Sequence, residues 1–250
     1  MFEDLSNPII FAHRGASAHA PENTLASFEL ALSQGADAIE LDVNLSADGE
    51  VVIIHDSTVD RTTNGHGRVA QLSLTELRSL DAGSFFSEKY HGEKIPLLKE
   101  VFEAIGKKIF INIELKNYAA PCDPLVDRVC ELVKKHSLEK RIIFSSFLAS
   151  NLKKAKRILP EVPCGLLTLN GWKGAWARSF GFSFGDYDAL HPYLTDVTKQ
   201  QVVRVHRLKR RVHVWTVNKT EDMVRLNNWG VDGIYTDDPQ LALHAMGRSL

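Results

Sequence analysis

The amino-acid sequence predicts an α/β fold, a single (β/α)8 barrel of the TIM type with a small insertion after its second strand. Eight short apolar runs alternate along the chain with amphipathic helical stretches, which is the order of elements in such a barrel. The runs are mostly continuous, as expected of parallel strands that are buried on both faces. The length of 250 residues is one that an α/β barrel commonly uses as one domain, so we expect a single domain over residues 1–250.

A doubly wound open sheet is the structural alternative. That fold binds its ligand at a glycine-rich turn after the first strand, and no Gly-x-Gly-x-x-Gly pattern follows the first apolar run here. Its absence favours the closed barrel.

The first elements are well marked. Residues 9–12 form a continuous apolar run that predicts a buried strand, and residues 25–32 keep a helical stripe that Thr24 can cap. The second barrel strand covers residues 37–43. An Asp-Gly turn then predicts a hairpin to a short strand over residues 51–54.

Residues 57–96 interrupt the alternation, because they are rich in Thr, Ser, Gly and charged residues and hold only one short helical stretch near residues 74–80. We interpret them as an insertion that lies over the barrel mouth. From residue 97 a helix leads to the strand at residues 109–115. The later strand candidates are residues 142–144, 164–167, 187–190, 212–217 and 233–235.

The stretch from Gly171 to Asp186 has no clean period. Two tryptophans and three phenylalanines lie among its glycines, and it matches no motif. The sequence leaves its role open.

Composition excludes several classes of protein. The 30 basic and 31 acidic residues give a formal net charge of -1, which predicts no general attraction to nucleic acid. The first residues lack the pattern of a signal peptide, and no run is long enough for a spanning helix, so we expect a cytoplasmic protein without membrane insertion. Three cysteines without a Cys-x-x-Cys pair indicate neither a disulfide framework nor structural zinc.

Carboxylates lie at the ends of two predicted strands. Glu40 and Asp42 leave the same face of one strand, and Glu114 ends the next barrel strand. The carboxyl ends of all the strands of a barrel meet at its mouth, so we expect the three side chains to lie close together. An all-oxygen set without cysteine or paired histidines predicts a site for one divalent cation, Mg²⁺ or Ca²⁺.

Basic and imidazole groups end strands at the same mouth. Arg14 and Lys116 would supply positive charge that suits a phosphate. His13 and His55 suit proton transfer. One can take a proton from the attacking oxygen, and the other can supply a proton to the leaving alkoxide. No Gly-x-Ser-x-Gly nucleophile elbow is present, so a phosphate ester fits better than a carboxylic ester.

These residues belong to an ordered set of motifs that is similar to the signature of the glycerophosphodiester phosphodiesterases and extends over nearly the whole chain. The motifs are His13-Arg14-Gly15, Pro21-Glu22-Asn23-Thr24, Glu40-Leu41-Asp42, Gly49-Glu50, His55-Asp56, Arg61-Thr62-Thr63-Asn64-Gly65, Glu114-Leu115-Lys116, Trp215-Thr216-Val217-Asn218 and Thr236-Asp237-Asp238-Pro239.

The resemblance implies a (β/α)8 barrel with a small insertion, and hydrolysis of a small-molecule glycerophosphodiester to glycerol 3-phosphate and an alcohol. One route would be attack by the neighbouring glycerol hydroxyl, which gives a transient cyclic phosphate. By resemblance, Glu22 would support the metal or Arg14, and Trp215 would line the alcohol side. The other roles follow those above: the cation on Glu40, Asp42 and Glu114, acid/base catalysis by His13 and His55, and phosphate on Arg14 and Lys116.

Two other hypotheses stay open. The first is a lysophospholipase D type phosphodiesterase on the same barrel, which exposed apolar residues at the mouth would favour. The second is a non-catalytic phosphate-binding module, which the presence of both His13 and His55 disfavours. Any one of these residues taken alone could be structural, and His191, at the end of a predicted strand, is one further histidine of interest. The sequence leaves open the native metal, the preferred head group and the oligomeric state.

Overall fold

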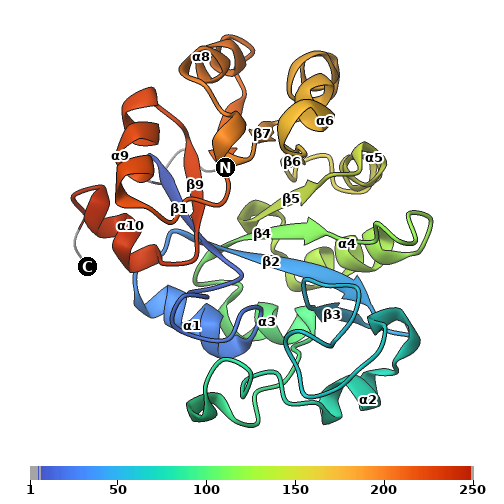
Figure 1. The fold of residues 1–250 in the computed structure, drawn as a ribbon. Helices are drawn as coiled ribbons and strands as arrows, with labels where there is room; N and C mark the ends of the chain where they lie inside the picture. Colours follow the sequence, from blue (N-terminus) through green and yellow to red (C-terminus); the bar gives the residue numbers. More distant parts are fainter. Residues whose placement is uncertain (1–4, 6, 249–250) are drawn as a thin grey trace.

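Eight parallel strands close into a barrel in the computed structural model, which describes residue 5 and residues 7–248 (Figure 1). The first strand pairs with the last one and with the second, so the ring of strands has no free edge. The predicted (β/α)8 fold is confirmed. The barrel strands are β1 (Ile9–His13), β2 (Ala38–Leu45), β4 (Phe110–Leu115), β5 (Ile142–Ser146), β6 (Cys164–Leu167), β7 (Ala189–His191), β8 (Arg211–Val214) and β9 (Gly233–Thr236).

Helices surround the barrel and connect successive strands (Figure 1). Their ends follow ordinary capping chemistry: Thr24 accepts a hydrogen bond from the Ser27 amide at the start of the first helix, and Asp238 caps the last one before a first-turn proline. The helices are α1 (Leu25–Ser33), α2 (Leu74–Ser79), α3 (Leu98–Ile105), α4 (Leu125–His136), α5 (Ala149–Ile158), α6 (Gly171–Trp176), α7 (Phe182–Phe184), α8 (Lys199–Arg207), α9 (Thr220–Trp229) and α10 (Pro239–Ala245).

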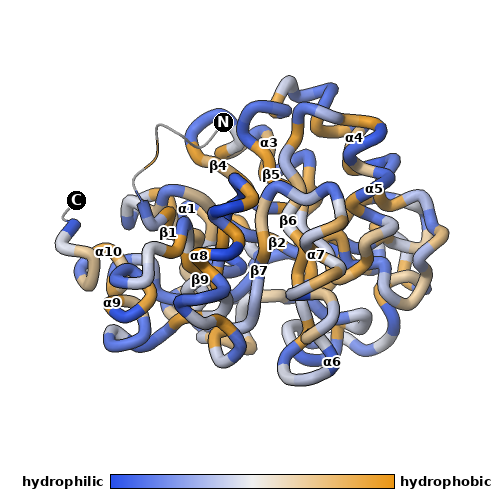
Figure 2. The backbone as a smooth tube through the Cα atoms, turned by 90° about the horizontal axis from the view of Figure 1, so that it is seen from above, coloured by the Kyte–Doolittle hydropathy of each residue, from blue (hydrophilic) through white to orange (hydrophobic). Residues whose placement is uncertain are grey.

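Two apolar layers hold these elements together. Side chains that leave the strands outward pack against the helices, and Figure 2 shows hydrophobic stretches along strands such as β4 and β5 and hydrophilic ones on outer turns. Inside the ring a smaller cluster includes Ile9, Phe11 and Tyr235. A buried pair of histidines lies beside it, with His213 Nδ1 3.1 Å from His191 Nε2. The barrel floor is therefore packed, and the open space lies above it.

The segment after β2 has a hydrophobic cluster of its own. The short strand β3 (Val51–Ile53) runs antiparallel to β2 after a hairpin in which Gly49 takes a φ of +82°. The loop after α2 is organised by Asp81, whose carboxylate accepts hydrogen bonds from the backbone amides of Gly83, Ser84 and Gly92. The cluster contains Val52, Ile54, Val59, Val69, Leu77, Ala82, Ile95 and Leu97.

Two segments differ from the sequence-based expectation. The predicted strand over residues 212–217 is shorter in the structure: β8 ends at Val214, and Trp215 follows with an isolated bridge to Tyr193. The stretch without a clean period is helical: α6, a π-helical segment η4 (Ala177–Gly181) and α7 follow one another. No helix in the described part of the chain is both long enough and apolar enough to cross a membrane.

Candidate active site

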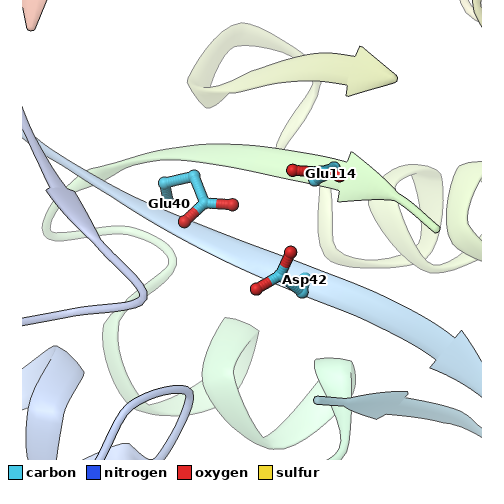
Figure 3. Close-up of side chains that lie close together, drawn as sticks. All are labelled: Glu40, Asp42 and Glu114. Carbon is cyan, nitrogen blue, oxygen red and sulfur yellow. The ribbon is translucent and has the colours of Figure 1, made fainter. Parts of the chain in front are cut away.

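Glu40, Asp42 and Glu114 come together at the carboxyl end of the barrel (Figure 3). The register between β2 and β4 places Asp42 opposite Glu114, and Glu40 leaves β2 two residues earlier on the same face. One oxygen of each carboxylate lies within 4.8 Å of one oxygen of each of the others. Glu40 and Asp42 are buried, so their charges are poorly screened by water.

The two carboxylates of β2 respond to this crowding in opposite ways. Burial and then the neighbouring charges of Asp42 and Glu114 raise the pKa of Glu40 well above its usual value. Burial also disfavours ionisation of Asp42, but the charges of Lys116 and Arg14 outweigh it and hold the pKa of Asp42 below its usual range. The crowding thus disfavours three ionised carboxylates side by side, and a cation would relieve it. The all-oxygen donor set fits a hard divalent cation.

Arg14 is fixed by a turn that only a few residues allow. It has a φ of +58°, and its backbone amide donates to Glu40 at 2.9 Å while its side chain reaches Glu22 at 2.9 Å and Asp42 at 3.4 Å. The next residue, Gly15, has a φ of +84° and lies against α1, where a Cβ would come within 2.3 Å of the Ser27 hydroxyl. The His-Arg-Gly motif is thereby explained as local backbone geometry.

A carboxylate far along the chain holds His13. The Nδ1–H of His13 donates to Asp237 Oδ1 at 2.7 Å. Because an ionised carboxylate can only accept a hydrogen bond, the ring proton lies on Nδ1, and Nε2 is the free ring nitrogen. Asp237 is held in turn by Asn218 Nδ2 at 2.5 Å and by the Ser17 hydroxyl at 3.1 Å. Burial alone would raise the pKa of Asp237, but the hydrogen bond from His13 and the other contacts keep it below its usual value.

His55 is held by the same kind of pair. Its Nδ1–H donates to Asp56 at 2.6 Å, and Asp56 accepts from Arg61 Nε at 2.6 Å. Arg61 also grips Glu22 with both terminal nitrogens, at 2.6 and 2.8 Å. His55 lines another pocket together with Glu22 and Asn23, and the Asn23 side-chain amide donates to Asp42 at 2.8 Å.

Lys116 and Trp215 border the remaining sides. Lys116 Nζ lies 3.4 Å from Asp42 and 3.2 Å from Glu114, so it neutralises the cluster from the β4 side. Trp215 donates its indole N–H to the His191 carbonyl at 2.8 Å and meets Phe147 edge to face. Trp215 and Phe147 line a cavity that has both polar and apolar side chains in its wall. Its lining residues are His13, Arg14, Glu40, Asn112, Glu114, Ser145, Phe147, Leu167, Trp215 and Tyr235.

Several residues at the site were not singled out from the sequence. Arg61 belongs to one of the sequence motifs, but the sequence assigns it no role. Its contacts with Glu22 and Asp56 depend on how the insertion folds back. The Tyr118 hydroxyl donates to Glu114 at 2.7 Å, and no spacing rule connects the two. Asn112 could have been found, because it lies two residues before Glu114 on the same face of β4.

His191 has no direct role at the cavity. It is fully buried beneath Trp215, and desolvation lowers its pKa to about 3, so it is neutral near pH 7. It supports the floor of the barrel.

Comparison with known proteins agrees with the motifs. A model of the Glycerophosphoryl diester phosphodiesterase family matches residues 13–241. The glycerophosphodiester phosphodiesterase of Caldanaerobacter subterraneus subsp. tengcongensis is 41% identical over 96% of this chain and 98% of its own length. A phosphodiesterase of Oleispira antarctica, solved with the product sn-glycerol-3-phosphate, has a TM-score of 0.88 at 36% identity and covers 96% of this chain and 97% of its own. A glycerophosphodiester phosphodiesterase from Agrobacterium tumefaciens has a TM-score of 0.81 at 31% identity, over 94% and 98% of the two chains. The chain belongs to the glycerophosphoryl diester phosphodiesterase family.

Proposed function

We propose that this protein hydrolyses glycerophosphodiesters to glycerol 3-phosphate and an alcohol, with one divalent cation held by Glu40, Asp42 and Glu114. The observation that carries the proposal is the cluster of three carboxylates with two cationic side chains beside it. His13 lines the cavity at this cluster and His55 lines another pocket, and each histidine donates to an aspartate. The relatives that share this barrel include an enzyme solved with glycerol 3-phosphate, which supports the same product here.

Binding of the phosphate falls to the cationic groups. A divalent cation on the three carboxylates would polarise a phosphoryl oxygen and stabilise the charge that develops on it. Arg14 and Lys116 already lie within 3.4 Å of Asp42, so a phosphate bound above the cluster would meet both side chains. Glu22 holds the Arg14 side chain in position, because it accepts a hydrogen bond from it.

Proton transfer falls to the two histidines. His13 and His55 each donate from Nδ1 to an aspartate, which leaves Nε2 of both rings free to take or give a proton. The imidazole of His13 takes the proton of the attacking glycerol hydroxyl, and the imidazole of His55, in its protonated form, gives its Nε2 proton to the departing alkoxide. Water then opens the transient cyclic phosphate with the two roles reversed, which yields glycerol 3-phosphate. The aspartates, Asp237 and Asp56, orient the rings and stabilise the imidazolium that forms.

The alcohol would occupy the apolar side of the cavity. Phe147, Leu167 and Trp215 supply its apolar lining. Such a wall favours the carbon skeleton of glycerol or of the alcohol and gives the phosphate one direction in which to bind.

Metal dependence supplies the direct test. Purified protein is assayed for glycerol 3-phosphate released from glycerophosphocholine, before and after exhaustive treatment with a chelator, and after Mg²⁺ or Ca²⁺ is added back. We expect activity to disappear with the chelator and to return with the metal. Glu114→Gln should abolish activity, whereas Glu131→Gln on the exposed surface of α4 should not. Full activity after chelation would contradict the proposal.

A second candidate has a specific observation in its favour. Leu169 and several aromatic side chains are exposed just beyond β6, whose last residue, Leu167, lines the cavity. An exposed apolar surface beside the mouth suits a lysophospholipid, which the lysophospholipase D type activity would cleave. The ratio of kcat/KM for lysophosphatidylcholine to that for glycerophosphocholine separates the two, and a ratio above one would replace the first proposal with the second.

A further inference from the structure

A row of exposed apolar side chains marks one side of the barrel. We call it the aromatic ridge and define it as Leu169, Trp172, Trp176, Phe180 and Phe184, whose exposed fractions are 51%, 84%, 71%, 65% and 87%. Seven of the ten large hydrophobic residues that are exposed in the described part of the chain lie between residues 169 and 208. A contiguous exposed apolar surface of this kind marks an interaction site.

The helical geometry keeps the four aromatic residues in line. They recur every fourth residue along α6, η4 and α7. In a regular α-helix with 3.6 residues per turn, such a row drifts around the axis. The π-helical segment η4 lies in the middle of the row, and its wider turns hold more residues, which reduces the drift.

Arginine side chains fix the ridge from its inner side. Arg178 donates to the Leu169 carbonyl at 2.7 Å and to the Gly171 carbonyl at 2.9 Å, and it pairs with Asp196 at 3.1 Å. Arg204 on α8 donates to the Arg178 carbonyl at 2.7 Å. The backbone is thus tied down while the aromatic rings face outward, so the ring surface is exposed by construction.

The inner face is anchored as well. Phe182 is buried between the exposed aromatics, its ring stacks on Tyr187, and the guanidinium of Arg210 lies 5.0 Å from it. This contact fixes which side of the short helices points to the barrel. The aromatic ridge therefore cannot turn inward without loss of a buried anchor.

Positive charge surrounds the ridge. In the outer ring of helices, α6 lies between α5 and α8 (Figure 1). Residues 149–211 contain twelve Lys and Arg against four Asp and Glu, although the whole chain has a net charge of -1. A groove between α5 and the end of the ridge is lined by Lys153, Lys154, Lys156 and Arg157 together with Asp186. Lys154 pairs with Asp127, and Lys156 pairs with Asp186 and Asp188, so the excess positive charge comes from Lys153 and Arg157. The apolar row thus lies within a basic surface.

The apolar row and the basic side chains around it favour a phospholipid surface over a second copy of the chain as the partner of the ridge. A symmetric dimer through the ridge would bring two positive surfaces face to face, which charge repulsion opposes. A phospholipid surface with anionic head groups would instead attract the basic side chains, and tryptophan is the residue that prefers the boundary between head groups and acyl chains. An apolar row flanked by Lys and Arg is the pattern of interfacial helices that bind such surfaces.

We propose that the aromatic ridge docks this protein on the surface of an anionic phospholipid bilayer. The ridge begins two residues beyond Leu167, which lines the cavity, so docking would hold that edge of the barrel mouth at the lipid surface. Vesicle binding does not require turnover, so its failure leaves the proposed hydrolysis untouched, and loss of hydrolysis leaves docking testable.

Sedimentation with vesicles tests the proposal. The full chain is mixed with vesicles of phosphatidylcholine and phosphatidylglycerol in equal parts, or of phosphatidylcholine alone, and the bound fraction is measured together with tryptophan fluorescence. We expect binding to the anionic vesicles with a blue shift, and weaker binding at high salt. The combined variant Trp172→Ser, Trp176→Ser and Phe184→Ser should bind about tenfold more weakly or worse, because aromatic burial carries much of the affinity.

Matched variants separate the ridge from general effects. Phe85→Ser, Phe86→Ser and Val224→Ser replace three exposed apolar residues elsewhere and should leave binding unchanged. Equal binding by the ridge variant and the wild type would overturn the proposal, as would absence of wild-type binding. If the wild type sediments as a dimer and the ridge variant as a monomer, the ridge would be assigned to contact with a second copy of the chain instead.

Charge reversal gives an independent arm. Lys153→Glu with Arg157→Glu changes the basic side of the groove on α5 and should reduce binding to anionic vesicles about 25-fold or more, because each basic residue near the surface contributes about 1 kcal/mol, a factor of roughly five. Lys134→Glu with Lys135→Glu makes the same change of net charge on α4 and should have a smaller effect. Equal losses of vesicle binding in the two double variants would show that net charge alone controls binding, and the assignment of the docking face would be wrong.

Discussion

Replacement of Asp237 by asparagine tests how the protein prepares His13 for proton transfer. The two side chains have the same shape, but an amide has one acceptor where the carboxylate has two. Asn218 cannot turn to suit the new group, because its own oxygen accepts from the Asp237 amide at 2.9 Å and from Thr236 at 3.2 Å. Its Nδ2–H must still be accepted by the side chain at 237, so the new NH₂ group faces His13.

The expected effect follows from that geometry. An NH₂ group at His13 Nδ1 forces this nitrogen to accept, and the ring proton moves to Nε2, which then cannot act as a base. The lost contact is a hydrogen bond of 2.7 Å to a charged group, which contributes about 1.5–3 kcal/mol. At 1.4 kcal/mol per factor of ten, kcat should fall about 10- to 100-fold while KM changes little.

Steady-state release of glycerol 3-phosphate from glycerophosphocholine measures the effect. The matched control is Asp238→Asn, the same change one residue further on, where the side chain caps α10 through the Leu241 amide. It should change stability little, because asparagine caps a helix about as well as aspartate, and it should leave kcat unchanged. Wild-type kcat in a folded Asp237→Asn protein would refute the tautomer argument, and equal losses in both variants would trace the effect to the loop.

Three further predictions concern stability. Gly165→Ala would place a Cβ 2.2 Å from His191 Nε2 in a fully packed floor, so thermal unfolding should show a loss of about 1–3 kcal/mol, and an unchanged Tm would mean that the floor can relax. The backbone amides of Ser84 and Gly83 hold the pKa of Asp81 below its usual value, so its stabilisation is present above the unfolded-state pKa of about 3.9 and lost as pH falls towards the folded-state pKa. Asp81→Asn should therefore lower the free energy of unfolding by about 1–3 kcal/mol at pH 7. In denaturant titrations this difference from the wild type should become smaller below about pH 4. A difference that does not change with pH would be inconsistent with this linkage. Mg²⁺ at about 100 times its Kd should raise stability by about 2.7 kcal/mol, and persistence of the Tm increase in Asp42→Asn would place the metal elsewhere.

Much of the candidate site could be predicted because strands impose strict alternation. Glu40 and Asp42 had to share a face of β2, and the carboxyl ends of parallel strands had to meet, so the carboxylates lie together as expected. Local turns could also be predicted, because a backbone with positive φ requires glycine at single positions such as Gly15 and Gly49. The fold class followed from the same signals.

Other features depend on contacts that no local pattern encodes. The tautomer of His13 is set by Asp237, 224 residues away, and Arg61 reaches Glu22 only because the insertion folds back over the first loop. The aromatic residues after β6 show the same limit. Their spacing of four is visible in the sequence, but whether the row faces the barrel or the solvent depends on Phe182 and its neighbours.

The sequence by itself determined the barrel, the acidic cluster, the family and the chemistry of each group, because these depend on residue type and on the periodicity of strands and helices. The tertiary structure decided which carboxylate orients which histidine, which cation neutralises which acid, and which face of a helix meets the solvent. The physical reason is that hydrogen bonds and charge interactions act over a few ångströms in space, whatever the separation along the chain.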